Sequence, residues 1–114
     1  MTAPVLSAIT RTGLQLSTEW VSPTIVRISA SGDIDAANYT DVLDYVLRRA
    51  ANCRSLILDF KDVTFFATAG FSMLQTIANR SSRASVSWMV VPSAPVARVL
   101  TICDPQRALP RGIE

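Results

Sequence analysis

Residues 55–60 read Ser-Leu-Ile-Leu-Asp-Phe, a nearly continuous apolar run near the middle of the 114-residue chain. A run of this kind, in place of a strict alternation of apolar and polar residues, is typical of a strand in a sheet that helices cover. It is far shorter than the roughly 20 apolar residues that a membrane-spanning helix needs. The segment therefore predicts a buried strand in an α/β domain, and no membrane partner is expected.

The segments around this strand show strand and helix patterns in turn. Residues 14–20 and 24–30 alternate apolar and polar side chains, and the short Val-Ser-Pro link between them predicts an antiparallel pair. Helical spacing follows in three stretches, which begin after Asp35, at Ala69 and after Ser93, and residues 84–91 predict a further strand. The order predicts a mixed, mostly parallel sheet of four to five strands with three to four helices.

Length and composition narrow the domain organisation and the location. We expect a single domain over residues 14–110, an N-terminal extension over 1–13 and a tail over 111–114. The first four residues lack the charged start and apolar stretch of a signal peptide, so a cytoplasmic location is expected. These patterns leave the oligomeric state open.

Several function classes are disfavoured by what the chain contains. A net charge of +2 on 18% charged residues makes no dense basic face, so no nucleic acid partner is expected. The chain has no histidine, the commonest general base and metal ligand, and two cysteines alone do not complete a zinc site. It also lacks a glycine-rich phosphate loop. We therefore expect no metal, no cofactor and no enzymatic activity.

Thr68 lies where an apolar, strand-like segment becomes a helix, within Val-Thr-Phe-Phe-Ala-Thr-Ala-Gly-Phe at 63–71. The first turn of a helix has free N–H groups and the positive end of the helix dipole, so a phosphate on Thr68 would meet donors and favourable charge. The alternative is that Thr68 is an ordinary N-cap whose oxygen accepts a hydrogen bond from the next turn.

The loops at the carboxyl ends of parallel strands gather at one edge of a sheet, where partners usually bind. The sequence places residues 32–38, 65–71 and 92–95 in such loops and predicts that they form one composite surface. Its partner-binding candidates are Asp33, Asp35, Asn38, Ala67, Thr68, Ala69, Gly70, Phe71 and Ser93.

Other interpretations stay open for some residues near these loops. Asp35 and Ser93 are also plausible helix caps, and Asp33 is a plausible turn residue. Of the phenylalanines at 65, 66 and 71, at least two are expected in the core. Asp59 and Asp62 are interpreted as solvated loop residues.

Four segments, taken in order, resemble the STAS domain of anti-sigma factor antagonists over roughly residues 14–110. They are Gly-Asp-Ile-Asp-Ala-Ala at 32–37, Leu-Ile-Leu-Asp-Phe at 56–60 followed by Val-Thr-Phe at 63–65, Gly70, and Val-Ala-Arg-Val-Leu at 96–100 running to Leu-Pro at 109–110.

This resemblance implies a partner-switching protein. Such a protein binds an anti-sigma factor that is also a serine/threonine kinase, frees a sigma factor for transcription, and loses the contact when the kinase phosphorylates it. The family acceptor lies in Asp-Ser-Ser/Thr-Gly, and Thr68 matches its position. Ala67 and Ala69 replace the acidic residue and the second hydroxyl, so two hypotheses remain: Thr68 is a working switch, or binding is controlled elsewhere.

Two further hypotheses concern the cysteines and the partner. If the first and third helices both run antiparallel to the sheet, Cys53 and Cys103 lie at the end away from Thr68, where a redox bridge is conceivable; the alternative is two small buried residues. The second possible function is a non-catalytic STAS subunit of another assembly, such as a lipid-transport ATPase or a stress-signalling complex, with no phosphorylation switch.

Overall fold

The computed structural model describes residues 6–9 and 13–112, and these ranges contain five strands and three helices. Their bounds are β1 (Leu6–Ile9), β2 (Gln15–Trp20), β3 (Ile25–Ile34), α1 (Tyr39–Arg49), β4 (Ser55–Phe66), α2 (Thr68–Arg83), β5 (Ser87–Pro92) and α3 (Ala94–Cys103). Within these ranges, no helix is both long enough and apolar enough to cross a bilayer. Strand β1 was not expected and lies inside the predicted N-terminal extension.

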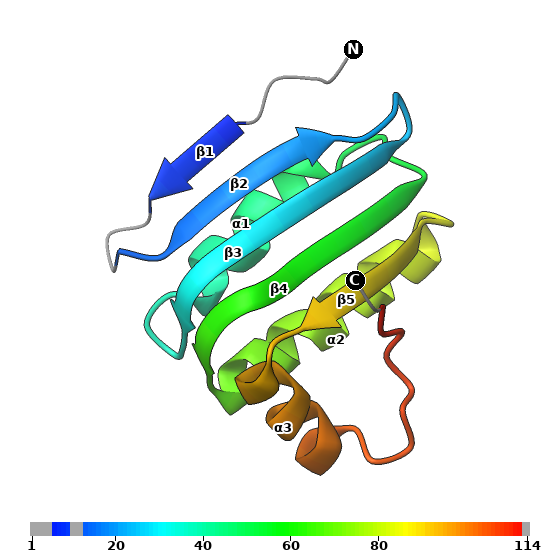
Figure 1. Ribbon diagram of the computed structural model, residues 1–114. Helices are drawn as coiled ribbons and strands as arrows, with labels where there is room; N and C mark the ends of the chain where they lie inside the picture. Colours follow the sequence, from blue (N-terminus) through cyan, green and yellow to red (C-terminus); the bar gives the residue numbers. More distant parts are fainter. Residues whose placement is uncertain (1–5, 10–12, 113–114) are drawn as a thin grey trace.

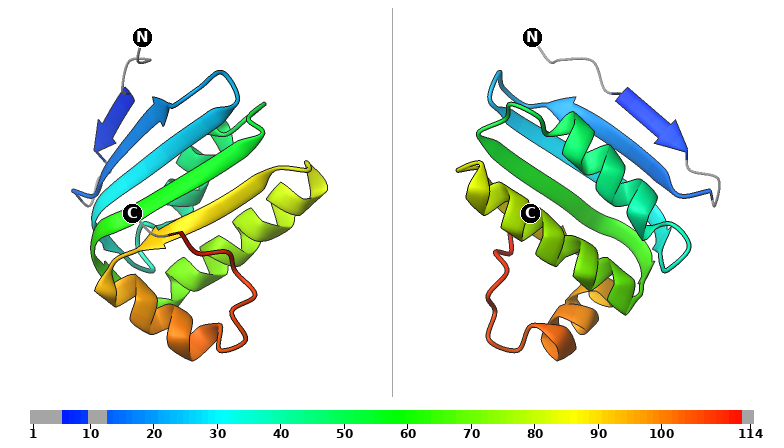
Figure 2. Two further views of the ribbon diagram at one scale, coloured as in Figure 1. Left: turned by 45° about the vertical axis from the view of Figure 1, so that its right-hand side comes forward. Right: turned by 180° about the vertical axis from the view of Figure 1, so that it is seen from behind.

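All five strands join one sheet in the order β1-β2-β3-β4-β5 (Figure 1). The pairs β1/β2 and β2/β3 are antiparallel, and the pairs β3/β4 and β4/β5 are parallel. The connections between the parallel strands run through α1 and α2, which lie on the same face of the sheet (Figure 2). The predicted α/β fold with a mixed sheet is confirmed.

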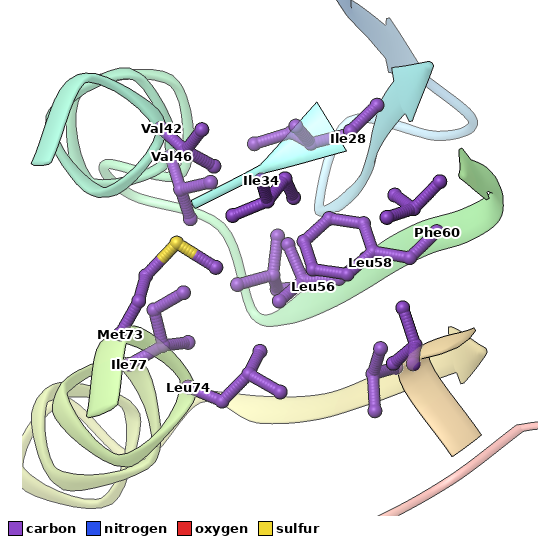
Figure 3. Close-up of a cluster of buried hydrophobic side chains, with 14 of the residues drawn as sticks. Ile28, Ile34, Val42, Val46, Leu56, Leu58, Phe60, Met73, Leu74 and Ile77 are labelled. Atoms are coloured by element: carbon purple, nitrogen blue, oxygen red, sulfur yellow. The ribbon is translucent and has the colours of Figure 1, made fainter. Parts of the chain in front are cut away.

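The hydrophobic core lies between the sheet and the two helices that cover it (Figure 3). From α1 it receives Val42 and Val46, and from α2 it receives Met73, Leu74 and Ile77, all of which are fully buried. The helical spacing of these residues places them on one face of each helix. Strands β3 and β4 contribute the facing side, with Ile28, Ile34, Leu56, Leu58 and Phe60.

Strands β3 and β4 are both longer than the sequence pattern indicates. The expected strand over 24–30 continues to Ile34, and the expected strand over 55–60 continues to Phe66. Their pairing shifts register between Ser29 and Ser31 and again between Gly32 and Asp33. Gly32 has a φ of +119°, which glycine adopts without strain. These irregularities break the alternation of side chains, so the extended half of each strand looked like a loop.

The interpretation of Asp59 as a solvated loop residue is wrong. Asp59 lies within β4 and is only 5% exposed. Its Oδ2 is 3.2 Å from Arg27 Nε on the neighbouring β3 and 2.9 Å from Lys61 Nζ. Leu58 and Phe60 on either side point into the helix-covered core, so the alternation of the strand directs Asp59 to the other face. Buried carboxylates require such partners. Asp62 is exposed as expected, although it too lies in β4.

Helix α3 lies at the carboxyl end of the sheet and contacts β4, and the chain then returns to the edge of β5 (Figure 2). Asp104 follows α3 and is buried, where its two carboxylate oxygens accept hydrogen bonds from the backbone N–H groups of Ala108 and Leu109 at 2.9 and 3.0 Å. Arg111 reaches the same carboxylate at 3.1 Å and bridges to Val90 of β5. Asp104 therefore holds the returning segment in place.

Candidate functional site

The three connections that leave β3, β4 and β5 lie at the same end of the sheet (Figure 1). They are the chain segments between β3 and α1, between β4 and α2, and between β5 and α3. The connections before α1 and α2 touch directly, because the backbone N–H of Ala67 donates to the carbonyl of Ile34 at 2.9 Å. The three connections therefore lie at one end of the sheet, as predicted, and this backbone hydrogen bond joins the first two.

Thr68 is the first residue of α2 and is exposed, so the N-cap interpretation of this residue is wrong. The N-cap is Ala67, whose side chain makes no capping hydrogen bond. The Thr68 hydroxyl makes no hydrogen bond to any residue in the described part of the chain. No acidic residue occupies the first turn of α2. No carboxylate from the first turn of α2 therefore lies at the positive end of the helix dipole. The free hydroxyl of Thr68 lies at that end.

Asp33 lies beside this helix start and is held by a residue from the neighbouring strand. The Thr64 hydroxyl on β4 donates to Asp33 Oδ1 at 2.7 Å, and both residues are exposed. Residues 33 and 65 are paired in the register of the sheet. The extension of both strands brings Asp33 to the Thr68 end of β4, and the hydrogen bond fixes where its carboxylate stands.

Asn38 is not a surface residue, contrary to its prediction as a partner contact. It is the N-cap residue of α1 and is 1% exposed, and its buried side-chain amide forms hydrogen bonds with the backbone of the preceding loop. Its Nδ2 donates to the Asp33 carbonyl at 2.8 Å, and its Oδ1 accepts from the Asp35 backbone N–H at 2.9 Å. Asn38 thus acts on the surface indirectly, by holding the backbone of Asp33 and Asp35.

Asp35 does not cap α1, because α1 begins four residues later. Its carboxylate instead accepts from the Ala37 backbone N–H at 2.9 Å, which is the hydrogen bond of an Asx turn. Asp35 is half-buried. Its side chain shapes the loop and still reaches the surface.

Gly70 is buried on the inner side of α2 and is not available to a partner. A Cβ atom built on it would lie 2.5 Å from Cε1 of Phe66, so only glycine lets the helix approach that ring. Phe66 is 4% exposed and packs near Phe60, with ring centroids 6.2 Å apart. Phe71 is partly buried against the same core.

The expectation that two of the three phenylalanines belong to the core is therefore confirmed, and the third is a surface residue. Phe65 is 52% exposed and lies on β4 between Thr64 and Phe66. Neither Phe65 nor Thr64 was among the predicted partner contacts. The signal in the sequence is the run Val-Thr-Phe-Phe, in which the residues at 63 and 66 are buried and the two between them face outward.

The remaining predicted contacts divide between surface and structure. Ala67 and Ala69 are half-buried beside Thr68. The alternative prediction that Ser93 caps α3 is confirmed, because the Ser93 Oγ accepts a hydrogen bond from the Val96 backbone N–H at 3.4 Å. The surface that the structure offers a partner thus consists of exposed Asp33, Thr64, Phe65 and Thr68, flanked by Asp35, Ala67 and Ala69.

The structure does not bring the two cysteines together. Both are free thiols. Cys53 lies in the connection between α1 and β4, and Cys103 is the last residue of α3. The figures show that connection and α3 at opposite ends of the sheet, because α3 does not run back along the strands as α1 and α2 do (Figures 1 and 2). The premise of a bridge between them is therefore wrong.

Comparison with known proteins agrees with this fold. The family model of the STAS domain matches residues 19–110. A crystal structure of an anti-sigma factor antagonist from Mycobacterium paratuberculosis is similar with a TM-score of 0.77 and 17% sequence identity, over 91% of this chain and 89% of that chain. The anti-sigma factor antagonist SpoIIAA in its unphosphorylated form gives a TM-score of 0.71 and 15% identity, over 87% of this chain and 89% of that chain.

A curated relative is similar in sequence. Osmosensory protein A of Mycobacterium tuberculosis is 30% identical over 73 residues, which is 64% of this chain. The aligned part is 46% of that relative, so the chain spans about half of its length.

Proposed function

Because the chain belongs to the STAS domain family, we propose that it is an anti-sigma factor antagonist, which binds an anti-sigma factor of the serine/threonine kinase type and so releases a sigma factor for transcription. Two solved structures that share its fold are of anti-sigma factor antagonists. The observation that carries the proposal is the exposed, unengaged hydroxyl of Thr68 at the start of α2, within the described part of the chain. The role is binding, without catalysis by this chain.

The partner surface combines an apolar ring with a carboxylate. Phe65 exposes about half of its ring, which supplies apolar area for a contact. Asp33 supplies a charge whose position is fixed by the hydrogen bond from Thr64. Fixed groups lose less conformational entropy on binding than mobile ones. A partner that presents an apolar pocket beside a cationic group fits this surface.

Phosphorylation of Thr68 would add negative charge to this surface and so weaken partner binding. A phosphate carries about −1.5 to −2 charges and three acceptor oxygens. The free N–H groups of the first turn of α2 stabilise it on this side, while the exposed Asp33 carboxylate already supplies negative charge on the same surface. A partner that had docked against Thr68 would meet the new charge, so binding is lost without unfolding.

A second candidate is a STAS subunit that binds its partner without a phosphorylation switch. Ala67 and Ala69 favour it, because they provide neither the acidic side chain nor the second hydroxyl of the family acceptor sequence. The surface and its binding role are the same in both candidates. They differ in the partner, which belongs to another assembly in the second candidate, and in whether a kinase modifies Thr68.

The two candidates are separated by mass spectrometry after the chain is incubated with the anti-sigma factor kinase and ATP. A phosphate on Thr68, absent from Thr68→Ala, supports the switch. Binding of the kinase with no phosphate on Thr68 indicates that binding is controlled elsewhere, and neither binding nor phosphate supports the second candidate.

The affinities of charge variants for the partner test independently whether negative charge at Thr68 weakens binding. Thr68→Glu is expected to weaken partner binding at least about tenfold, since the new carboxylate must be desolvated where the wild type presents an uncharged hydroxyl. Ser82→Glu is the matched control, because Ser82 is exposed on the last turn of the same helix. It is expected to bind as the wild type does.

A further inference from the structure

The segment after α3, residues 108–112, returns to the sheet and reaches the outer edge of β5 (Figure 1). Arg111 forms a parallel bridge with Val90 of this strand. The Val90 backbone N–H donates to the carbonyl of Pro110 at 3.0 Å, and the Gly112 backbone N–H donates to the carbonyl of Val90 at 2.8 Å. Residues 108–112, here called the strap, therefore occupy the place beside β5 that another strand would take.

Strand β5 needs such a cover. It is the last strand in the order of the sheet, so one of its two sides is an edge. Its sequence, Ser-Trp-Met-Val-Val-Pro at 87–92, has no charged residue and includes the aromatic and β-branched types that favour strands. Proteins usually keep edge strands from pairing with another chain by charges, by proline or by a covering segment. Pro92 removes a donor only at the end of β5, so the strap is what covers the middle of the edge.

The strap is held by Asp104, the buried residue that follows α3. Its Oδ1 accepts a hydrogen bond from the Ala108 backbone N–H at 2.9 Å, and its Oδ2 accepts one from the Leu109 backbone N–H at 3.0 Å. Arg111 lies 3.1 Å from the same Oδ2, and the side chains of this ion pair are only 14% and 7% exposed. Leu109 is also buried in the core. One carboxylate thus fixes both the start of the strap and the residue that bridges to β5.

The ion pair between Asp104 and Arg111 gives the strap a defined position more than it adds stability. Both charges lose solvent when they are buried, and this cost offsets most of their attraction. Removing one partner is unfavourable, however, because the other charge is then left buried alone. The pair therefore disfavours any arrangement in which Arg111 leaves Asp104, and with it any arrangement in which the strap leaves β5.

We propose that the strap, anchored by Asp104, keeps β5 from pairing with β5 of a second copy of this chain. In the pair that the strap prevents, the two identical strands run antiparallel about a two-fold axis. Each Val90 then exchanges its hydrogen bonds to the strap for hydrogen bonds to the other copy. The uncharged sequence of β5 favours a second copy as the partner, because no like charges meet when this strand pairs with itself. The proposal does not depend on the function proposed for the composite surface.

The test compares the self-association of the wild type and Asp104→Ala by analytical ultracentrifugation over a concentration series. Without its anchor the strap detaches, so Asp104→Ala should self-associate at least about tenfold more tightly than the wild type. Hydrogen exchange followed by NMR at low concentration reports on the strap itself. The Val90 and Gly112 amides should exchange at least about tenfold faster in Asp104→Ala, because their hydrogen bonds open locally.

Asn38→Ala is the matched control for a general loss of stability. It also removes a buried side chain that bonds to two backbone groups, but in the loop before α1, so it should self-associate as the wild type does. Adding Ser87→Lys to Asp104→Ala places a charge at an exposed position of β5 and should return self-association to the level of the wild type. Arg111→Gln leaves the two backbone hydrogen bonds of Asp104 in place, so it gives a milder form of the same test if Asp104→Ala does not fold.

Three results overturn the proposal. The first is self-association of Asp104→Ala and Arg111→Gln no tighter than that of the wild type. The second is equal self-association of Asn38→Ala and Asp104→Ala, which would assign the effect to lost stability alone. The third is association of Asp104→Ala that Ser87→Lys does not weaken, which would place the contact away from β5.

Discussion

Replacing Gly70 with alanine tests how closely α2 approaches β4. The added Cβ would lie 2.5 to 3.0 Å from three atoms of the Phe66 ring, closer than carbon atoms pack. Phe66 is buried and near Phe60, so the ring has little room to move away. Overpacking of this kind destabilises by about 1–3 kcal/mol. Alanine regains up to about 1 kcal/mol through its helix propensity.

The net expectation is that Gly70→Ala lowers the free energy of unfolding by about 1–2 kcal/mol, or the melting temperature by roughly 4–8 °C. Urea and thermal unfolding of the wild type and the variant measure both. Gly112→Ala is the matched control. Its Cβ would meet the thioether of Met89 at 2.6 Å, but that side chain is flexible and rotates away, so little stability is lost.

A second background makes the test specific to the ring. In a Phe66→Leu chain the clash is relieved, so Gly70→Ala should destabilise less there than in the wild type. If Gly70→Ala is as stable as the wild type, or destabilises equally in both backgrounds, the contact between Gly70 and Phe66 does not limit the approach of α2.

Two further predictions concern the buried polar groups. Asn38→Ala should lower the free energy of unfolding by about 2 kcal/mol, because the Asp33 carbonyl and the Asp35 N–H lose their partners; denaturant unfolding measures the loss, and an unchanged midpoint would contradict it. The pKa of Asp104 is below its usual range: burial alone would raise it, but hydrogen bonds from two backbone N–H groups and the Arg111 charge outweigh burial. The folded state therefore favours the ionised form, and its stabilisation is lost as pH falls below about 3.9. The advantage of the wild type over Asp104→Asn in unfolding curves should shrink in that range, and a constant difference would refute the assignment.

Local patterns were enough to predict the order of the elements and that the three connections lie at one end of the sheet. Helical spacing identified all three helices, and Ser93 was correctly expected to cap α3. The composite surface followed from topology alone, because the carboxyl ends of parallel strands meet at one edge. The order and direction of the strands determine this arrangement without any contact between particular residues.

What the sequence did not reveal depends on contacts between distant residues. The register shifts after Ser29 and Gly32 extend β3 past the point where its alternation ends, and they also bring Asp33 to Thr64, 31 residues away. Asp59 is buried because Arg27 on another strand neutralises it. Asn38 turns inward because the loop backbone offers it both a donor and an acceptor. Residue type alone indicates a surface position for each of these polar side chains.

The affinity of the chain for the anti-sigma factor kinases of its host, compared among wild type, Thr68→Ala and Thr68→Glu by calorimetry, tests the central claim most directly. We expect one kinase to bind wild type and Thr68→Ala with similar affinity and Thr68→Glu at least about tenfold more weakly, since only glutamate adds charge at the start of α2. Equal binding by all three variants would contradict the switch at Thr68. Failure of every such kinase to bind the wild type would contradict the proposed function itself.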